Sequence, residues 1–488
     1  MQTFSHYLNT YEEYGEVIRI NHPVVAVRGL PGLRIKEIVL FEDGQIGEVF
    51  TLYKDEASVL VFSSEPVSVG SRLVRTNEAL QIPAGEALLG QTISPLGRSL
   101  SFSTPIPSLP DLFPVHTVPE GILGRKRITR PLLTGVTVVD MLLPFGKGQK
   151  ELILGDRKTG KSSFVLNAMQ EQAAEGAIIV YGAIGKKKSD IALVESIISK
   201  NKMAKNMVIV ASYALDSPGL IYLTPFSAMT IAEYFASKGS DVVLVLDDLL
   251  THAKYYREFS LIAKKYPGRD SYPGNIFYTY ARLLERAGNF THKEKGEVAI
   301  TCLPVVETLE GDVSDYLTTN LMSITDGHLF FDTDIFYEGR RPSINIELSI
   351  TRVGKQTQNK LSSQLASRIS AHLADYNRVK SLSYFGQELS EDAKITLQRG
   401  EQILTLFDQS EHLLIPLEIQ LVMIGLLLNG MLQGDKEHVR STEKILIEKA
   451  QEKTYQELFA SFMSLQTIDE FLSVIKKEGN KLQNLWQK

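Results

Sequence analysis

The sequence predicts three domains of different classes: a small β-barrel, a central α/β domain with a parallel sheet, and a C-terminal bundle of helices. Short β-branched runs recur within residues 14–82, and apolar runs alternate with helical stretches within residues 83–355. Residues 356–488 are rich in Leu, Gln, Glu and Lys at helical spacing, and we expect residues 1–13 to form a short tail. A chain of 488 residues has room for about three domains.

The composition is that of an ordinary globular chain, with 43% hydrophobic and 22% charged residues. Its net charge of -5 gives no basic field, so a nucleic-acid partner is not predicted. The single cysteine, Cys302, lies in the apolar run "VAITCLPVV", which predicts a buried thiol. Because the first residues lack the basic and apolar regions of a signal peptide, we expect a cytoplasmic protein.

The N-terminal domain rests on β-branched runs separated by turn dipeptides such as Pro31-Gly32 and Asp43-Gly44. Many short strands with regular turns predict an all-β barrel or sandwich. The runs are "EVIRI" (16–20), "VVAV" (24–27), "IKEIVLF" (35–41), "IGEVFTL" (46–52), "SVLVF" (58–62) and "SRLVRT" (71–76).

The central domain is defined by apolar strands that alternate with helical stretches, notably 189–200 and 227–239. Near-continuous apolar strands between helices indicate a parallel sheet covered on both faces, where ligands bind at the carboxyl ends of strands. The predicted strands are 151–155, 177–182, 207–212, 241–248, 298–306 and 344–350.

The C-terminal domain is predicted from helical runs at 361–379, 390–407, 416–432 and 442–463. The longest apolar stretch, residues 412–432, is interrupted by Pro416, Glu418, Gln420 and Asn429. A membrane span needs about 20 residues with few or no charges. We therefore predict a buried helix here and no direct membrane span.

A phosphate-binding loop follows the first strand of the central domain. The strand "ELILG" leads into two glycines separated by four residues and followed by Lys and Ser, and the helix "SSFVLNAMQEQ" comes next. Glycines let backbone N–H groups face phosphate oxygens, Lys161 adds a positive charge, and the Ser162 hydroxyl can join a Mg²⁺ shell. The predicted nucleotide contacts are Gly155, Asp156, Arg157, Lys158, Thr159, Gly160, Lys161, Ser162 and Ser163.

A second acidic element ends the strand "VVLVLDDLL" in Asp247 and Asp248. A carboxylate at a strand end beside a phosphate loop can hold the water shell of Mg²⁺, and Asp247 is the better candidate by register. Together with Ser162, it predicts a magnesium site. The predicted cofactor is Mg-ATP or Mg-ADP.

Hydrolysis of that nucleotide needs a group that orients or deprotonates the attacking water. In ATPases with such a sheet, the group is expected near the end of the next strand, where this chain reads "YGAIGKKKSD". Lys186, Lys187 and Lys188 stand where a glutamate is wanted, and a lysine ammonium cannot act as a base at neutral pH. Whether the lysines bind something or form a solvated turn, no carboxylate is supplied there.

Several long blocks resemble the alpha subunits of F-type rotary ATP synthases, the largely non-catalytic nucleotide-binding subunits of a hexameric head. The resemblance runs from about Tyr14 to the C-terminus, and it implies a RecA-like central domain, a catalytic beta-type neighbour and a gamma-type central shaft. The blocks include "IPAGEALLGQTISPLGRSL", "RPLLTGVTVVDMLLPFGKGQKELILGDRKTGKSS", "YPGRDSYPGNIFYTYARLLERAG" and "LPVVETLEGDVSDYLTTNLMSITDGHLFF".

The resemblance also assigns residues around the base of the nucleotide. Arg341 and Pro342 would pack near the adenine, and Gln409 aligns with one of two glutamines that face the base in the family. Glu411 stands in place of the other glutamine. At the phosphate end, Lys158 and Lys186 stand where the family usually has glutamine, and their charges would tighten phosphate binding.

The segment "LSITRVG" resembles the family's Ser-x-Ser-Arg-Val-Gly segment, whose arginine reaches into the catalytic site of the neighbouring beta-type subunit. Arg352 is therefore the candidate arginine finger, acting in trans. Ser349 is assigned to the same catalytic segment, and Thr351 replaces the commoner serine. Such a guanidinium is worth about 10³–10⁵ in rate.

For assembly, the resemblance places "YFGQELSEDAKITLQRG" (384–400) near the central shaft, as a shaft contact or as a solvated turn. The family's longer N-terminal helical segment, which anchors a peripheral stalk, has no counterpart before residue 14. A standard stalk is therefore not predicted, and a specialised motor, such as the heads adapted to gliding motility in some wall-less bacteria, is an alternative. The complex would hold the chain at the inner face of the cell membrane.

Two alternatives come from other functional classes. A self-sufficient homohexameric export-type ATPase would need a catalytic glutamate after the second strand, and "AIGKKKSD" has none. A ring helicase resembling Rho would need a basic, aromatic-bearing RNA surface, which neither the net charge nor the N-terminal strands supply.

Overall fold

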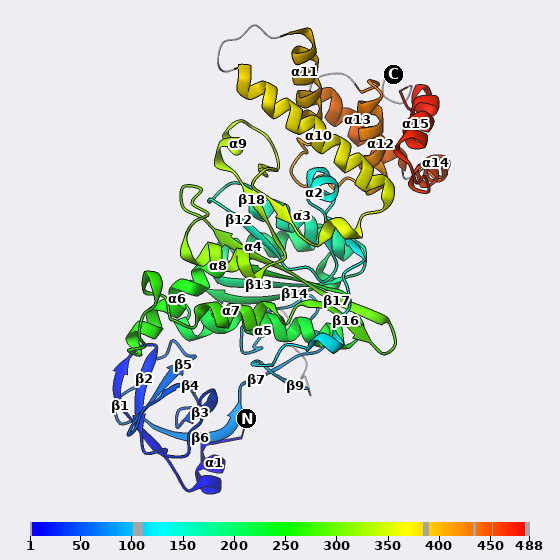
Figure 1. Ribbon diagram of the computed structural model, residues 1–488. Coiled ribbons are helices and arrows are strands. Elements are labelled where there is room, and N and C mark those ends of the chain that lie inside the picture. Colours follow the sequence, from blue (N-terminus) through cyan, green and yellow to red (C-terminus); the bar gives the residue numbers. More distant parts are fainter. Residues whose placement is uncertain (1, 101–110, 384–389, 433–435, 451, 484–488) are drawn as a thin grey trace. The chain divides into compact units, whose positions relative to one another are not determined.

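Figure 1 shows the computed structural model, which describes residues 2–100, 111–383, 390–432, 436–450 and 452–483. The chain forms two compact units, each assembled from segments that are separate in the sequence. Unit 1 comprises Met1–Arg127, Ala173–Thr308 and Asp312–Thr325. Unit 2 comprises Ile128–Gln172, Leu309–Gly311 and Asp326–Lys488.

The first part of unit 1 is a closed antiparallel barrel, which confirms the predicted β-barrel. Alternate side chains point inward, so Val25 and Val27 of one strand are buried in the barrel core with Val59 and Val61 of its neighbour. The strands run β1-β2-β5-β4-β3-β6 around the barrel. Their bounds are β1 (Gly15–Asn21), β2 (Val24–Arg28), β3 (Glu37–Phe41), β4 (Ile46–Leu52), β5 (Ala57–Val61) and β6 (Arg72–Ala79).

A short helix, α1 (Phe4–Tyr11), precedes the barrel and packs on its outside. Its N-terminus is capped by Thr3, whose side chain accepts a hydrogen bond from a backbone N–H of the first turn. Tyr7 is buried against Leu40 and Val74, and its hydroxyl donates to Glu78 at 2.9 Å. Residues 4–11 are therefore part of the folded unit.

The remainder of unit 1 holds a parallel sheet with the strand order β17-β15-β13-β14-β8, to which β16 adds antiparallel beside β17. The predicted strands at 177–182, 207–212, 241–248 and 298–306 are confirmed, and Cys302 is buried in the last of them. The bounds are β8 (Thr92–Ile93), β13 (Ile178–Lys186), β14 (Met207–Tyr213), β15 (Val242–Asp247), β16 (Gly288–His292) and β17 (Gly296–Glu307); β7 (Gln81–Pro83) and β9 (Leu112–Pro114) form a separate pair.

Helices cover this sheet, and the longest begins well before its predicted start at residue 227. Helix α5 starts at Pro218, directly after the N-cap Ser217, and most of its residues are buried. An apolar character all round the helix leaves no 3.6-residue periodicity from which to read its first half. The helices are α4 (Lys188–Lys200), α5 (Pro218–Ser237), α6 (Leu249–Ile262), α7 (Ile276–Leu284) and α8 (Tyr316–Ile324).

Unit 2 contains the strand that precedes the phosphate loop, β12 (Glu151–Gly155), in parallel with β18 (Gly327–Phe331). The predicted strand 344–350 is wrong, because only Ile350–Thr351 forms a strand there, β19, antiparallel to β18. The Asn345 side chain accepts hydrogen bonds from the backbone N–H groups of residues 347 and 348, which favours a turn over a strand. The other elements are β10 (Pro131–Leu132), β11 (Phe145–Gly146), α2 (Thr137–Leu142), α3 (Lys161–Ala174) and α9 (Thr333–Tyr337).

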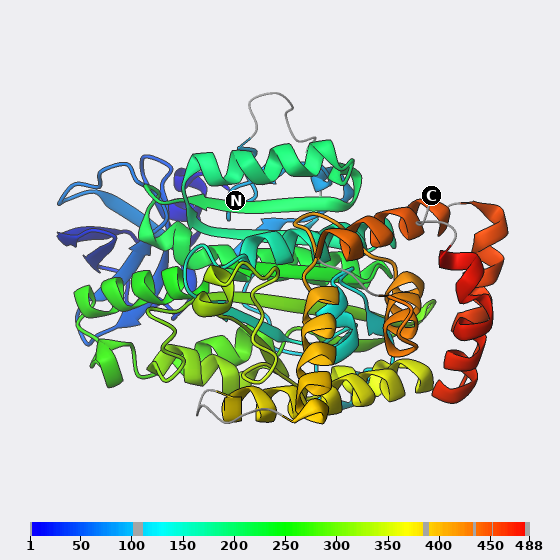
Figure 2. The same ribbon diagram turned by 90° about the horizontal axis from the view of Figure 1, so that it is seen from above.

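The C-terminal part of unit 2 is helical, as predicted, and Figure 2 shows α10 and α11 side by side. Their close approach depends on Gly400, where an added Cβ would lie 2.2 Å from the ring of Tyr376. The Tyr376 hydroxyl donates to Glu401 at 3.2 Å. The helices are α10 (Lys360–Ser383), α11 (Glu391–Leu406), α12 (Leu417–Leu428), α13 (Lys436–Ala450), α14 (Lys453–Met463) and α15 (Ile468–Gln483).

Helix α12 forms the centre of this bundle and corresponds to the long apolar stretch of the sequence. It contacts α11, α13, α14 and α15, and residues 419–427 are all buried. Burial on every side explains why the helix is apolar all round. Within the described residues, no helix combines the length and the apolar character that a membrane crossing requires.

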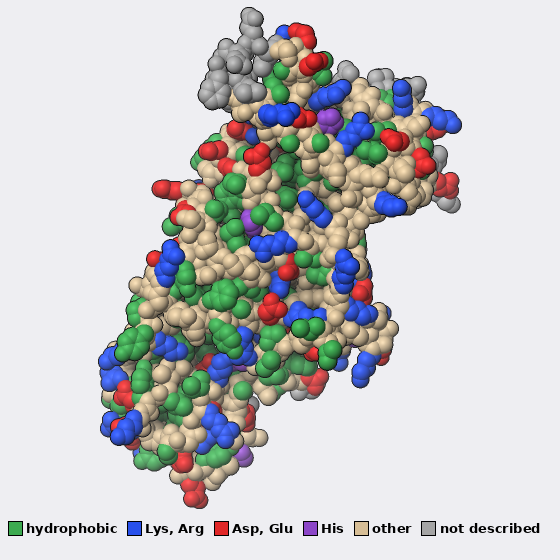
Figure 3. Space-filling view, viewed as in Figure 1, with side chains coloured by type: hydrophobic (Ala, Val, Ile, Leu, Met, Phe, Trp, Pro, Cys, Tyr) green, Lys and Arg blue, Asp and Glu red, His purple; other side chains and the backbone are tan. Residues whose placement is uncertain are grey.

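The surface carries mixed charge. On the face shown in Figure 3, Lys and Arg side chains are interspersed with Asp and Glu side chains over the described residues. Binding of a nucleic-acid backbone is dominated by clustered basic groups. This face therefore does not present the broad field of positive charge that such binding uses.

A buried carboxyl in α13 makes the stability of unit 2 depend on pH. Glu443 is 1% exposed, and burial, partly offset by the charge of Arg440, raises its pKa from 4.5 to about 8. Because the pKa is higher in the folded state, the protonated carboxyl stabilises the fold fully below about pH 4.5, and this contribution is lost as the pH rises through about 8.

We therefore expect the free energy of unfolding to fall with rising pH between about 4.5 and about 8 in the native chain, by up to about 1.4 kcal/mol per pH unit relative to Glu443→Gln. Urea unfolding of both chains at a series of pH values measures the difference. Glu448→Gln, at an exposed position of the same helix, is the control and should keep the native pH profile. Parallel profiles for the native chain and Glu443→Gln would contradict the expectation.

Candidate nucleotide-binding site

The phosphate loop of unit 2 joins the end of β12 to the start of α3, and its glycines are required by the geometry. Gly155 has a φ of +148° and a Cβ added there would lie 2.3 Å from the carbonyl oxygen of Phe331. Gly160 has a φ of +96°, in the region that residues with a Cβ rarely adopt. The predicted strand, loop and helix are thus present in the order that phosphate binding uses.

Hydrogen bonds within unit 2 hold the loop in shape. The Asp156 carboxylate accepts from the backbone N–H of Gly311 at 2.9 and 3.0 Å and from the Thr333 hydroxyl at 3.1 Å. Thr159 donates to the carbonyl of Asp156 at 2.7 Å, and Ser343 donates to the carbonyl of Thr159 at 2.7 Å. Asp156 and Thr159, both predicted as nucleotide contacts, therefore use their side chains to hold the loop.

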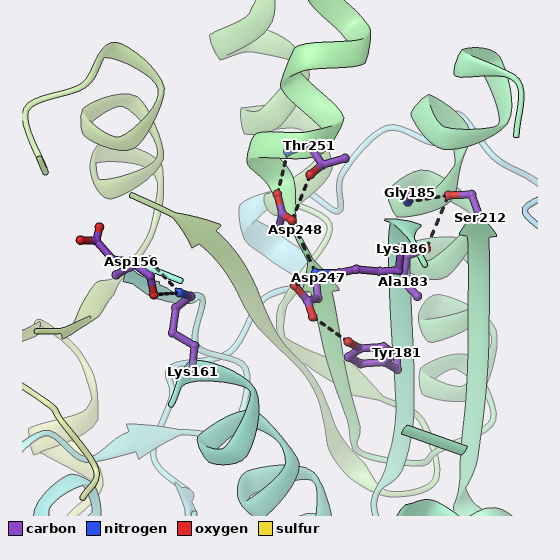
Figure 4. A network of polar contacts seen from close by, with 11 residues as sticks. Asp156, Lys161, Tyr181, Ala183, Gly185, Lys186, Ser212, Asp247, Asp248 and Thr251 are labelled. Carbon is purple, nitrogen blue, oxygen red and sulfur yellow. Dashed lines mark hydrogen bonds and ion pairs between the residues drawn. The ribbon is translucent and has the colours of Figure 1, made fainter. Parts of the chain in front are cut away.

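Lys161 lies over the loop with its ammonium 2.7 Å from the carbonyl oxygen of Gly155 and 2.5 Å from that of Asp156 (Figure 4). Only 7% of the residue is exposed. Phosphate oxygens are stronger acceptors for an ammonium than peptide carbonyls because they are charged. Lys161 is thus positioned to bind an anion in the loop, where Arg157, Lys158 and Ser162 are exposed.

A pocket beside the loop brings together the residues predicted to surround the base. It encloses about 350 Å³ of free space, including its open mouth. Arg341 forms one wall, with its guanidinium 3.6 Å from the ring centre of Phe336. The pocket is lined by Val136, Gly160, Ser163, Phe164, Asn167, Arg341, Pro342, Gln409, Ser410 and Glu411. The sequence interpretation did not assign Val136, Phe164 and Asn167, which supply much of the apolar surface expected for a base.

Gln409 lines this pocket as predicted, but its amide is already paired with the protein. Its oxygen accepts from the backbone N–H of Thr137 at 3.0 Å, and its nitrogen donates to the carbonyl of Gly135 at 2.7 Å. The residue is 3% exposed. Gln409 therefore fixes the pocket wall, and Glu411, which lies 3.8 Å from Arg341, is the more accessible polar group.

The segment that carries Arg352 is held by its neighbours. The Ser349 hydroxyl is buried, donates to the carbonyl of Asn345 at 2.6 Å and accepts from the backbone N–H of Phe330 at 2.9 Å. Thr351 donates to the carbonyl of Pro144 at 2.9 Å. Ser349 thus stabilises the segment from the inside, which makes it a positioning residue and not a group that reaches a substrate.

The Arg352 side chain itself is exposed at the end of β19. Its backbone N–H donates to the carbonyl of Asp326 at 3.0 Å, and no ion pair of its guanidinium is found among the described residues. Nearby, burial raises the pKa of Glu151 well above its usual value, an effect that a hydrogen bond from Gln149 and the charge of Arg352 lessen. The guanidinium is therefore available to a group outside this chain.

The acidic strand end of unit 1 is paired with a lysine. Asp247, the last residue of β15, accepts from the ammonium of Lys186 at 2.6 Å and from the hydroxyl of Tyr181 at 2.7 Å (Figure 4). Asp248 caps α6 by accepting from the backbone N–H of Thr251 at 2.6 Å, and it lies 3.5 Å from Lys186. The parallel register of β13 and β15 brings these side chains together.

The charges in this cluster are those of an ion pair. Burial acts to lower the pKa of Lys186, but the charges of Asp247 and Asp248 together outweigh it and the pKa is raised. Burial raises the pKa of Tyr181 well above its usual value, and the charge of Asp247 adds to this. At neutral pH Lys186 is therefore charged and Tyr181 keeps its proton, so both donate to Asp247.

Comparisons with known proteins agree with this geometry. Residues 135–351 match the nucleotide-binding domain of the ATP synthase alpha/beta family, and residues 358–478 match the C-terminal domain of the ATP synthase alpha/beta chain. The first match includes the loop, the acidic strand end and Arg341. The second covers most of the helical bundle.

Individual relatives align over most of the chain. The ATP synthase subunit alpha of Clostridium botulinum (strain Eklund 17B / Type B) is 35% identical over 436 residues, 89% of this chain and 86% of that protein. The subunit alpha of Neorickettsia sennetsu is 37% identical over 423 residues, 85% of this chain and 82% of its own. That of Helicobacter pylori (strain G27) is 37% identical over 413 residues, 84% of this chain and 82% of its own. The chain therefore belongs to the ATP synthase alpha/beta family, and these relatives within it are alpha subunits.

Proposed function

We propose that this chain binds ATP or ADP without turning it over and serves as the alpha-type subunit of a rotary ATPase head. The observation that carries the proposal is Lys186. It stands at the end of β13, where a self-sufficient ATPase needs a carboxylate, and its ammonium is paired with Asp247. A group that is charged and already paired in this way does not take a proton from water.

Binding of a nucleotide is supported by the loop and the pocket beside it. The backbone of the loop and the N-terminus of α3 suit phosphates, with Lys161 as the principal cation and Arg157 and Lys158 as further charges. The slot next to Gly160 and Ser163 suits the base and the sugar. Ser162 is exposed at the first turn of α3, where it would meet a metal ion carried by the nucleotide.

The second part of the proposal concerns a neighbouring beta-type subunit, whose catalytic site would receive Arg352. Support comes from the exposed guanidinium and from the buried hydrogen bonds that hold its segment. A gamma-type shaft would be a further partner; part of the stretch assigned to it, residues 384–389, lies outside the described residues. We propose a cytoplasmic location, at the membrane only through the complex, driving ATP synthesis or ATP-dependent rotation, including motility.

A direct test compares the purified chain alone with the chain assembled with its beta-type partner. We expect the chain alone to bind ATP but to show negligible turnover, and the assembled complex to hydrolyse ATP at a native mass that includes both chains. The reason is that the base and the arginine finger come from different subunits. Robust turnover by the chain alone would replace the proposal with the homohexameric ATPase.

Lys161→Ala separates binding from chemistry in the same complex. It should weaken ATP binding to this chain by about tenfold or more, since a charged hydrogen bond to phosphate is lost. The initial rate of ATP turnover should persist, because the chemistry occurs on the partner. Lys158→Ala, a removal of charge from the exposed part of the loop, is the control and should weaken binding less. Loss of turnover in Lys161→Ala, without loss of assembly, would show that this loop is catalytic.

A further inference from the structure

All carboxylate oxygens at the end of β15 have donors from the same unit. In Asp247, Oδ1 accepts from Lys186 at 2.6 Å and Oδ2 from Tyr181 at 2.7 Å. In Asp248, Oδ1 accepts from the backbone N–H of Thr251 at 2.6 Å and Oδ2 from the Thr251 hydroxyl at 3.0 Å, with Lys186 at 3.5 Å. Both carboxylates are therefore engaged before any ligand arrives.

The site is also largely shielded from water. Side-chain exposure is 21% for Lys186, 13% for Asp247 and 5% for Asp248. Removing one partner of such an ion pair leaves a charge without a counter-ion in a poorly solvated place. Lys186 therefore does not leave Asp247 without a considerable cost.

A magnesium ion, which the fold family implies at this strand end, does not fit this arrangement. The carboxylate that would accept hydrogen bonds from its water shell is saturated by an ammonium and a phenol. An ammonium beside the carboxylate also repels a second cation, and the repulsion is weakly screened where water is scarce. The prediction that Asp247 holds the metal is therefore not supported by its surroundings.

We propose that Lys186 replaces Mg²⁺ as the counter-ion of Asp247, so that this chain binds free ATP or ADP with little dependence on magnesium. The inference rests on the proposed function, because it concerns the nucleotide bound by the same chain. It gives the substitution of lysine for the family's usual glutamine a physical consequence. A glutamine amide carries no charge, so in Lys186→Gln the Asp247 carboxylate would again attract a hydrated divalent cation.

The test is a titration of the full chain with a fluorescent ATP analogue, in MgCl₂ and in excess EDTA. For the native chain we expect the two dissociation constants to differ by less than about threefold, whereas in Lys186→Gln removal of magnesium should weaken binding by about tenfold or more. Lys187→Gln is the matched control, because it removes the same charge from the neighbouring exposed position. Its behaviour should follow that of the native chain.

Lys186→Arg provides a second variant that keeps the positive charge beside Asp247. It should retain binding in EDTA, which distinguishes loss of charge from damage to the fold in Lys186→Gln. A native chain that depends on magnesium as strongly as Lys186→Gln would overturn the inference and leave the proposed function standing. A native chain that binds no nucleotide in either buffer would overturn both.

Discussion

Replacing Arg352 with alanine is expected to lower the ATP turnover of the assembled complex by about 10³–10⁵-fold. Binding of nucleotide to this chain should be unchanged. The guanidinium is exposed at the end of β19 and makes no ion pair among the residues described, so the fold does not depend on it. Its proposed contribution is to the transition state of a reaction on the neighbouring subunit, where charge develops on the transferred phosphoryl group.

Steady-state turnover of the complex and ATP binding to the isolated chain measure the two effects separately. Lys355→Ala, which removes an exposed cation three residues further on, is the control and should leave turnover within a few-fold of native. Arg352→Lys keeps the charge but loses the planar fork, so intermediate turnover is expected. Full activity of Arg352→Ala, with normal assembly, would exclude the arginine-finger role.

The second large effect concerns stability, and it comes from Arg286, which follows α7 in unit 1. Its guanidinium is 2% exposed and forms a two-point contact with the Glu233 carboxylate, at 2.7 Å for each nitrogen–oxygen pair. It also donates to the carbonyl of Val115 at 2.9 Å and to the hydroxyl of Thr230 at 2.9 Å. One side chain thus joins α5 to the segment that follows β9.

Arg286→Ala should lower the free energy of unfolding of unit 1 by about 3–5 kcal/mol, because Glu233 and two further acceptors lose their donor in a buried place. Urea unfolding followed by circular dichroism measures this loss. Arg282→Ala removes an arginine one turn earlier whose hydrogen bond, to Thr117, is 3.4 Å long. That control should cost less than about 1 kcal/mol. Equal stability of the two variants would contradict the assignment.

Much of the fold follows from patterns that act locally. The barrel strands show a period of two because one face of each is buried, and the phosphate loop is specified by glycines at Gly155 and Gly160 whose backbone excludes a Cβ. The strand expected at 344–350 failed because one residue, Asn345, bonds its own backbone and turns the chain. The neighbouring strand β18 escaped notice because five residues give little periodicity.

The candidate site divides in the same way. Arg341, Pro342 and Gln409 were assigned through resemblance, and the structure brings them to one pocket. What each side chain does there depends on distant partners. The Gln409 amide is used up by the backbone of Gly135 and Thr137, which are 274 and 272 residues away in the chain. No local pattern reports such a contact.

Local patterns in the chain are enough to specify a barrel, a phosphate loop and a helical bundle, because strand alternation, glycine spacing and helical periodicity are properties of neighbouring residues. They are also enough to show that lysine replaces a carboxylate after "AIG". The role of that lysine, in contrast, is set by tertiary packing. The register of β13 against β15 places Lys186 2.6 Å from Asp247, across 61 residues of sequence. An ion pair of this kind forms through the packing of neighbouring strands, and it is this contact that changes the expected role of the acidic strand end.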